Sequence, residues 1–519
     1  MSNIVFQEPR IREHISLESL GEGIRLNILT NAIHLCTAMS IMLFIERVYM
    51  AIVITCAKCF EKKRYMKHKS DAMKEDLEQN RNYPMVLVQI PMYNEKEVYK
   101  LSIGAVCGLS WPADRLIVQV LDDSTNRSIR ELVVNECEKW KGKGVNVKYE
   151  TRNNRNGYKA GALNEGLNKN YVNDCEFVAI FDADFQPDAD FLLRTIPYLL
   201  ENPELGLVQA KWKFVNADEC MMTRLQEMSL DYHFSVEQEV GSSTCSFFGF
   251  NGSAGVWRIQ ALNDAGGWKD RTTVEDMDLA IRANLRGWKF LYVGDLEVQN
   301  ELPSTFKAYR IQQQRWSCGP ANLFRKMLKE ILLSEHASLY KKFQVIYAFF
   351  VRKIIAHWVT LYFYCIVIPI IVVHPEIDLV KPLALYLPAT VTILNAACTW
   401  RSIHLILPWI LFENAMSLHR ANAALIGLLE GSGVNEWVVT EKLGYALRQR
   451  PSLRAPWTQE WQFIIRRIHL HEFLMGLYLM HTAVHDLMYG NNHFYGFLFM
   501  QAAAFFTVGV SNVGTFIPN

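Results

Sequence analysis

Net charge is almost absent from this chain. Its 54 lysines and arginines are balanced by 53 aspartates and glutamates, which leaves +1 at pH 7 over 519 residues. No global field therefore favours a nucleic-acid partner, and neither a basic, aromatic-laced groove nor a zinc-finger pattern occurs. We predict a protein that does not bind nucleic acid.

A disulfide framework and a signal peptide are missing as well. The 11 cysteines are odd in number and scattered. Cys56 and Cys59 form a lone CxxC pair beside an apolar segment, and because no second ligand pair follows, reduced or lipidated cysteines are favoured over a metal site. Residues 1–25 are polar and of mixed charge, without the apolar stretch and cleavage site of a secretory signal, so we expect a polar tail.

Apolar residues, by contrast, make up 50% of the chain, and they are clustered, so the mean hydropathy is only +0.01. Residues 26–57 are long enough to cross a bilayer of about 30 Å, and the basic stretch 58–69 would hold the next domain on the cytoplasmic side. We predict a C-terminal membrane region over 343–519, interrupted by a polar amphipathic segment at 430–467. Its predicted spans are Ile354–Val373, Leu383–Thr399, Ile403–Met416, His469–Tyr489 and Phe494–Val510. We expect about six crossings in all.

Between these apolar regions the sequence alternates like an α/β domain. Met85–Ile90 and Leu116–Leu121 are short apolar runs separated by amphipathic sequence, which is typical of a parallel βαβ sheet. Val178–Phe185 contains a further apolar run that ends in Asp182 and Asp184. Alternate residues of an extended chain point to the same face, so both carboxylates can reach one divalent cation.

Two more aspartates follow the second of these strands. Ligands bind beyond the carboxyl ends of parallel strands, so Asp122 and Asp123 are expected to share one crevice with Asp182 and Asp184. Four carboxylates this close together would repel each other, and a bound cation usually offsets such repulsion.

Two further segments carry candidate chemistry. Residues 156–164, Asn-Gly-Tyr-Lys-Ala-Gly-Ala-Leu-Asn, match neither a Walker A loop nor GxGxxG; they indicate either a turn at a helix start or a phosphate contact through Lys159. Asp276 precedes apolar residues and is expected at a helix start facing the cleft, as a general base or as an aspartate serving the helix dipole. Glu275 is the weaker candidate for the base.

A further helix is predicted to begin at Ser304-Thr305, directly after Pro303. Gln312, Arg315 and Trp316 follow at positions i, i+3 and i+4, and so share one face of that helix. Arg315 offers a fork of donors for phosphate oxygens.

The order of these motifs resembles the processive family 2 glycosyltransferases, the cellulose-synthase superfamily. The wider sequence is similar to the plant cellulose-synthase-like A group, the glucomannan 4-β-mannosyltransferases, over about residues 35–515. The motifs that carry the resemblance are Asp122-Asp123, Lys159–Asn164, Asp182-Ala-Asp184, Thr273–Asp276 and Gln312–Trp316, with Gln209–Asn216, Phe248–Ser253 and Arg315–Asn322. One departure is Asn251-Gly-Ser253, where bacterial cellulose synthases have a cysteine-glycine-serine acceptor loop.

The resemblance implies a fold and a reaction. It implies a GT-A-type α/β nucleotide-sugar-binding domain with a mostly parallel sheet at 84–303, interface helices at 304–342, and a multi-pass α-helical membrane region. The reaction would be inverting polymerisation of β-1,4-linked mannan or glucomannan from GDP-mannose, with GDP-glucose as a second candidate donor, for plant cell-wall hemicellulose in the Golgi membrane. Mg²⁺ or Mn²⁺ would be the cofactor, and the partners would be the nucleotide sugar, the growing glycan and membrane lipids. Accessory and oligomeric partners stay open.

The resemblance also implies roles for individual residues. Asp276 and Asp123 are assigned to catalysis, and Asp184 to the metal. Donor contacts are expected from Asp122, Lys159, Asp182, Asp184 and Arg315, and acceptor contacts from Gln312, Gln313, Trp316, Gly252 and Ser253.

Alternative functions are open at this stage. One is a cellulose-synthase-like β-1,4-glucan synthase that uses UDP-glucose. Another is a non-catalytic sugar-binding transporter, which would be expected to lack Asp276 or Arg315, whereas both are present. A two-metal phosphodiesterase predicts metal-ligating histidines near the acids, and none lies between Asp122 and Asp184. The basic stretch after the first span favours a cytoplasmic active site, while the Golgi resemblance makes a luminal one a rival.

Overall fold

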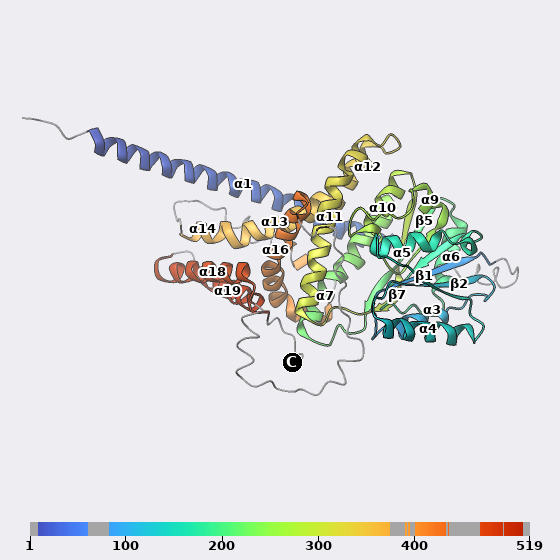
Figure 1. Cartoon of the computed structure of the whole chain (residues 1–519). Helices are drawn as coiled ribbons and strands as arrows, with labels where there is room; N and C mark the ends of the chain where they lie inside the picture. The colour runs from blue at the N-terminus through green and yellow to red at the C-terminus, as the bar shows by residue number, and fades with distance from the viewer. Residues whose placement is uncertain are drawn as a thin grey trace, which may run out of the picture.

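The computed structural model describes residues 9–60, 83–373, 400–431, 468–490 and 493–511, with a few single positions between 390 and 434. An α/β domain lies at one end and a group of long helices at the other, with helix α1 (Pro9–Phe60) extending away from the sheet (Figure 1). Most of the predicted span Leu383–Thr399 and most of the polar segment 430–467 lie outside the described residues.

The α/β domain is built on a seven-stranded sheet with strand order β3-β2-β1-β4-β6-β5-β7. Only β6 runs antiparallel to its neighbours, so the predicted mostly parallel sheet is confirmed. The strands are β1 (Val86–Met92), β2 (Leu116–Asp122), β3 (Val147–Thr151), β4 (Phe177–Ile180), β5 (Leu205–Phe214), β6 (Gly255–Arg258) and β7 (Lys289–Asn300).

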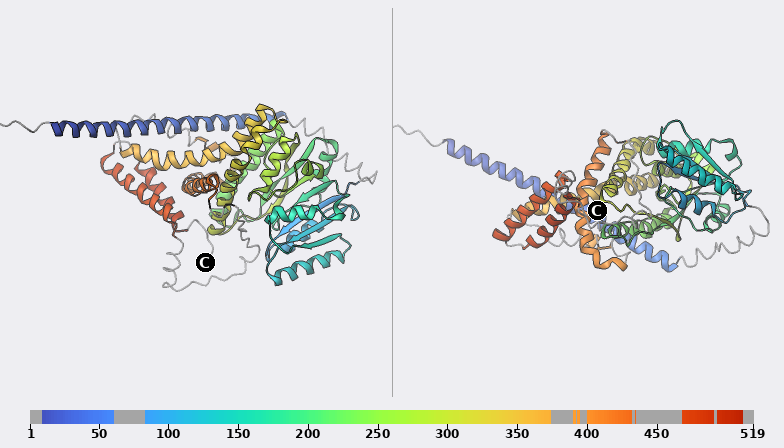
Figure 2. Two further views of the ribbon diagram at one scale, coloured as in Figure 1. Left: turned by 45° about the horizontal axis from the view of Figure 1, so that its top comes forward. Right: turned by 60° about the horizontal axis from the view of Figure 1, so that its bottom comes forward.

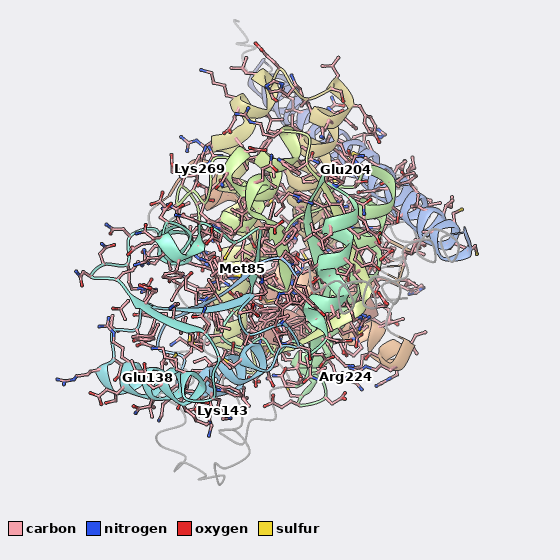
Figure 3. All side chains as sticks on the ribbon, turned by 90° about the vertical axis from the view of Figure 1, so that its right-hand side faces the viewer. Met85, Glu138, Lys143, Glu204, Arg224 and Lys269 are labelled. Atoms are coloured by element: carbon pink, nitrogen blue, oxygen red, sulfur yellow. The ribbon has the colours of Figure 1, made fainter. Side chains whose placement is uncertain are left out.

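Helices cover both faces of this sheet. In β1, Val86, Val88 and Ile90 pack into one apolar cluster and Leu87 into the other, because side chains alternate across a strand. The first face is covered by α3 (Tyr99–Cys107), α4 (Arg127–Lys141) and α6 (Phe191–Glu201), and the second by α5 (Tyr158–Leu167), α9 (Ile259–Asp264) and α10 (Glu275–Leu285). Figure 3 shows these layers, with Met85 near the centre, Glu138 and Lys143 below it, and Lys269 and Glu204 above.

The strand register places the predicted acids at one edge. Met92 of β1 lies opposite Asp122 of β2, and Gln89 lies opposite Ile180 of β4. Because these strands are parallel, their carboxyl ends meet where Asp123 and Asp182 follow.

A long helix, α11 (Phe306–Leu333), leaves the domain next to this edge. The Thr305 hydroxyl accepts a hydrogen bond from Ala308 N at 3.2 Å, which confirms the predicted helix start. A continuous helical segment, α7 (Met221–Tyr232), the π-helical turn η4 (His233–Gln238) and α8 (Glu239–Cys245), lies between the sheet and the long helices (Figure 2).

Two segments of the described residues are long and apolar enough to cross a membrane. They are Leu26–Ala57 within α1, as predicted, and Leu339–Val373, which contains the predicted span Ile354–Val373. The second segment runs through α12 (Leu339–Gln344), η5 (Val345–Val351), α13 (Arg352–Val359), η6 (Thr360–Val367) and α14 (Ile368–Val373).

The other described helices of the C-terminal region do not meet the same criterion, so the predicted count of about six spans is not confirmed. They are α16 (Ile406–Leu429), α18 (Leu470–Tyr489) and α19 (Tyr495–Gly509). In α16 one reason is the ion pair between Glu413 and Arg420, which places two charges in the middle of the helix.

Candidate active site

A pocket of about 190 Å³ opens beyond the carboxyl ends of β1, β2 and β4, between the sheet and α11. Most of the residues predicted from sequence meet there, although their motifs are far apart in the chain. Those in its lining are Asp123, Lys159, Asp182, Asp184, Gly252, Asp276, Gln312, Arg315 and Trp316. The expected crevice at the strand ends is therefore confirmed.

Asp122, Ser253 and Gln313 do not line this pocket. The Asp122 carboxylate is buried and accepts hydrogen bonds from the Tyr149 hydroxyl and Ser124 N, each at 2.9 Å. The prediction that Asp122 shares the crevice is wrong, because these donors hold its carboxylate elsewhere.

The other two residues support the walls of the pocket. Ser253 Oγ accepts a hydrogen bond from Asp182 N at 2.9 Å, so it orients the backbone that carries Asp182. Gln313 Oε1 accepts a hydrogen bond from Arg420 Nε of α16 at 2.8 Å, which turns that side chain toward the long helices. Neither side chain lines the pocket in this structure, and the acceptor contacts expected of both residues stay a prediction.

Protein cations partly neutralise the acid cluster. Lys159, at the start of α5, lies 2.5 Å from Asp182 Oδ1, and Arg152 forms a two-point ion pair with Asp123. Burial by itself would lower the pKa of Lys159, but Asp182 and Glu275 raise it above its ordinary value, so the ammonium stays charged. Part of the repulsion that the sequence predicts is therefore offset by side chains of the protein itself. Sequence reasoning missed Arg152, which directly follows β3.

Asp276 lies at the second position of α10 and lines the pocket, which confirms the predicted helix start. Its Oδ1 accepts a hydrogen bond from Met277 N at 2.7 Å. Burial raises the pKa of Asp276 above its ordinary value, although the nearby Lys159 opposes the shift. Burial and the neighbouring Asp276 charge raise the pKa of Glu275 too. A buried carboxylate with a raised pKa is a stronger base than a solvated one.

Gly252 allows the chain to approach this carboxylate closely. Its φ is +82°, and a Cβ added there would lie 2.8 Å from Asp276 Oδ2. Its carbonyl oxygen accepts a hydrogen bond from Lys159 Nζ at 2.8 Å. Only glycine suits both the left-handed backbone and the short distance.

Helix α11 presents Gln312, Arg315 and Trp316 to the pocket from one face, as their spacing predicts. Burial lowers the pKa of Arg315, while the carboxylates of Glu275 and Asp182 oppose that shift. Gly319, one turn further on, packs against α10, since a Cβ there would lie 2.6 Å from Val274 Cγ1. The two helices that carry Asp276 and Arg315 are thereby fixed against each other.

Two more pocket residues were not assigned from the sequence. The Arg155 guanidinium lies 3.4 Å from the ring centroid of Tyr93, and both side chains line the pocket. This cation–π contact holds the guanidinium of Arg155 in the pocket, as a third cation of the lining besides Lys159 and Arg315. The sequence feature that could have pointed to this contact is Tyr93, because it directly follows β1 and so lies at the edge of the sheet where ligands bind.

The carboxylates fit a metal that the substrate helps to hold. Among the described residues no three His, Cys, Asp or Glu side chains are grouped to ligate an ion by themselves. Mg²⁺ commonly takes one or two protein carboxylates and completes its shell with substrate phosphates and water. Asp182 and Asp184 both line the pocket, and Asp184 Oδ2 accepts a 3.4 Å hydrogen bond from Glu301 N.

Comparison with known proteins agrees with this arrangement. Residues 87–252 match the sequence family described as Glycosyl transferase family 2, and residues 177–418 match Glycosyl transferase family group 2. The chain is 66% identical to glucomannan 4-beta-mannosyltransferase 1 of Cyamopsis tetragonoloba, with 100% of both chains covered. It is 59% identical to glucomannan 4-beta-mannosyltransferase 9 of Arabidopsis thaliana, over 100% of this chain and 96% of that protein.

Among solved structures, a mannosyltransferase from Pyrobaculum calidifontis in complex with GDP-Man and Mn²⁺ aligns with a TM-score of 0.47 and 17% identity. The alignment covers 76% of this chain and 99% of that one, and the likeness is too weak to assign a ligand. The full-length identity to curated enzymes, with the motif residues gathered in one pocket, shows that the chain belongs to the glucomannan 4-beta-mannosyltransferases of glycosyltransferase family 2.

Proposed function

We propose that this enzyme polymerises β-1,4-linked mannan or glucomannan at a membrane, transferring mannose from GDP-mannose with inversion at the sugar carbon. The observation that supports this most is the placement of a partly buried carboxylate, Asp276, in the same pocket as Lys159 and Arg315. A base and a set of cations are what an inverting transfer from a nucleotide sugar requires.

In this mechanism Asp276 takes the proton from the attacking hydroxyl of the acceptor sugar. The hydroxyl oxygen forms the new glycosidic bond as the bond from the sugar to the diphosphate breaks. Lys159 and Arg315 stabilise the charge that develops on the leaving diphosphate. A divalent cation bound by Asp184 would add further positive charge there.

Trp316 would form the platform for the acceptor sugar. Its side chain lines the pocket from the same face of α11 as Arg315. The flat apolar face of an indole suits the C–H side of a pyranose ring.

The donor can be tested directly. Membranes that contain the protein would be incubated with GDP-mannose or with UDP-glucose, followed by linkage analysis of the product. We expect β-1,4-linked mannose from GDP-mannose, and at least about 10²-fold less from matched membranes that carry Asp276→Asn. Incorporation from UDP-glucose alone would instead support a glucan synthase.

We further propose a multi-pass arrangement in the Golgi membrane. Its support is the two candidate spans on either side of the catalytic domain, together with the apolar helix α19. Protease protection in sealed Golgi vesicles would report the side on which the catalytic domain lies.

Replacing Arg315 and replacing Trp316 should impair different steps of the reaction, although the two residues are neighbours on one helix face. Arg315→Ala is expected to raise the donor requirement and to slow the chemical step by about 10²-fold, since it removes charge from the leaving group. Trp316→Ala should leave donor hydrolysis largely intact and shorten the polymer, because the acceptor dissociates between additions. Donor affinity, GDP release and product length would be measured on the same membranes.

Arg325→Ala is the matched control, because Arg325 is an exposed residue of the same helix that pairs with Glu430. It should change none of the three quantities. An equal loss of hydrolysis and product length in Trp316→Ala would show that Trp316 is not the acceptor platform.

A further inference from the structure

Four charged side chains meet where the two candidate membrane segments touch the catalytic domain. Glu46 and Arg47 come from α1, Arg352 from the start of α13, and Glu237 from the π-helical turn η4. Glu237 Oε1 lies 3.2 Å from Arg47 Nη1 and 3.3 Å from Arg352 Nη2, and Arg352 Nη1 lies 3.0 Å from Glu46 Oε1. Glu237 thus joins both segments to η4.

This cluster is largely shielded from solvent. The exposed fractions of the four side chains are 9% for Arg47 and for Arg352, 10% for Glu46 and 16% for Glu237. Two arginines face two carboxylates, and the neighbouring Lys353 adds a positive charge that also acts on Glu237. Removing the Glu237 charge would leave two arginines sharing one carboxylate in a poorly hydrated site.

The second oxygen of Glu237 connects the cluster to His233. His233 Nδ1 lies 2.9 Å from Glu237 Oε2, one turn away in the same helical segment. The other ring nitrogen, Nε2, lies 3.1 Å from Asn251 Oδ1 and 3.0 Å from Gln238 Nε2. The wider π-helical turn places both Glu237 and Gln238 beside His233.

Asn251 lies in the wall of the catalytic pocket. Gln238 Nε2 also donates to Asn251 Oδ1, at 3.1 Å, so two side chains of η4 hold this amide. The next residue, Gly252, packs against Asp276 and accepts the hydrogen bond of Lys159. A shift of η4 would therefore move the backbone beside the catalytic carboxylate.

We propose that Glu237 is a positioning residue that couples the two membrane segments to the acceptor side of the pocket, through His233 and Asn251. The proposal rests on the polymerase function proposed above. It assigns Glu237 no contact with substrate. Glu237 holds the pocket wall beside Asp276 in place, so that the growing glycan chain stays bound between successive sugar additions.

The test uses the full-length protein in membranes, with GDP-mannose as donor, and measures GDP release and product length together. Glu237→Gln keeps the size of the side chain and removes its charge, and we expect it to shorten the mean product by about threefold or more, with a smaller loss of GDP release. His233→Asn keeps a group near the Nδ1 position but no longer reaches Asn251, and it should give the same change. The double variant should be no worse than either single variant, because both act through one chain of contacts.

Glu227→Gln is the matched control. Glu227 lies on α7 of the same helical segment and pairs with two arginines, Arg224 and Arg401, but does not line the pocket. It should leave product length unchanged at equal protein abundance, and Glu237→Asp should recover part of the length. Equal shortening by Glu227→Gln, or additive losses in the double variant, would overturn the coupling. Absence of any product from the unaltered protein would instead refute the polymerase function itself.

Discussion

Replacing Asp276 with asparagine is expected to lower turnover by at least about 10²-fold while donor binding is retained. The amide keeps the size of the carboxylate and can still accept a hydrogen bond from Met277 N, so the start of α10 should be preserved. It cannot take a proton from the acceptor hydroxyl. GDP-mannose binding and the initial rate of polymer synthesis, measured on the same membranes, would check this result.

The pH dependence gives a second check on the same residue. Because burial raises the pKa of Asp276, the base is protonated, and activity lost, at a higher pH than for a solvated aspartate. We expect kcat/KM to fall as the pH decreases through this raised value, and the remaining activity of Asp276→Asn to lack that fall. Retained turnover in Asp276→Asn would assign the proton transfer to another group, of which Glu275 is the nearest candidate.

Removing divalent cations should abolish synthesis and weaken donor binding together. The pocket presents Asp182 and Asp184 but, among the residues described, no group of three ligands, so the ion would be held jointly with the diphosphate. Chelation followed by addition of Mg²⁺ or Mn²⁺ should restore both properties. Asp184→Ala should lower activity by about 10³-fold and raise the metal concentration required for half-maximal rate.

Asp188→Ala is the control for this substitution, because Asp188 is an exposed aspartate only four residues further along the chain and is absent from the pocket lining. It should leave the metal requirement unchanged. If Asp184→Ala kept the metal requirement of the unaltered protein, the ligand would have to be another pocket carboxylate.

Local pattern was sufficient for the elements that carry the site. The apolar runs at 85–90 and 116–121 correspond to β1 and β2, and the spacing of Gln312, Arg315 and Trp316 placed all three on the pocket face of α11. Both predictions depend only on the side-chain periods of a strand and of a helix, which can be read from the order of apolar and polar residues along the chain.

The number of membrane crossings is not confirmed, and the reason is also physical. Hydropathy measures the composition of one segment, so the apolar residues of Ile403–Met416 predicted a span. In the folded protein most of this segment belongs to α16, whose Glu413 pairs with Arg420 of the same helix, and Arg420 also donates to the Tyr309 hydroxyl of α11 at 2.8 Å. Hydropathy along one segment does not detect such a contact between helices.

The α/β fold class, the order of the motifs and the position of Asp276 at a helix start could all be predicted from the amino-acid sequence. The packing of distant elements, in contrast, set the partners of the side chains at the strand ends. Asp122 and Asp123 are adjacent, yet Tyr149 holds the first away from the crevice while the second lines it beside Arg152. In the same way Glu237 meets Arg47, 190 residues away in the chain. Contacts of this kind depend on how elements pack, because the direction of a side chain at a strand end or helix turn is set by partners that arrive from distant segments.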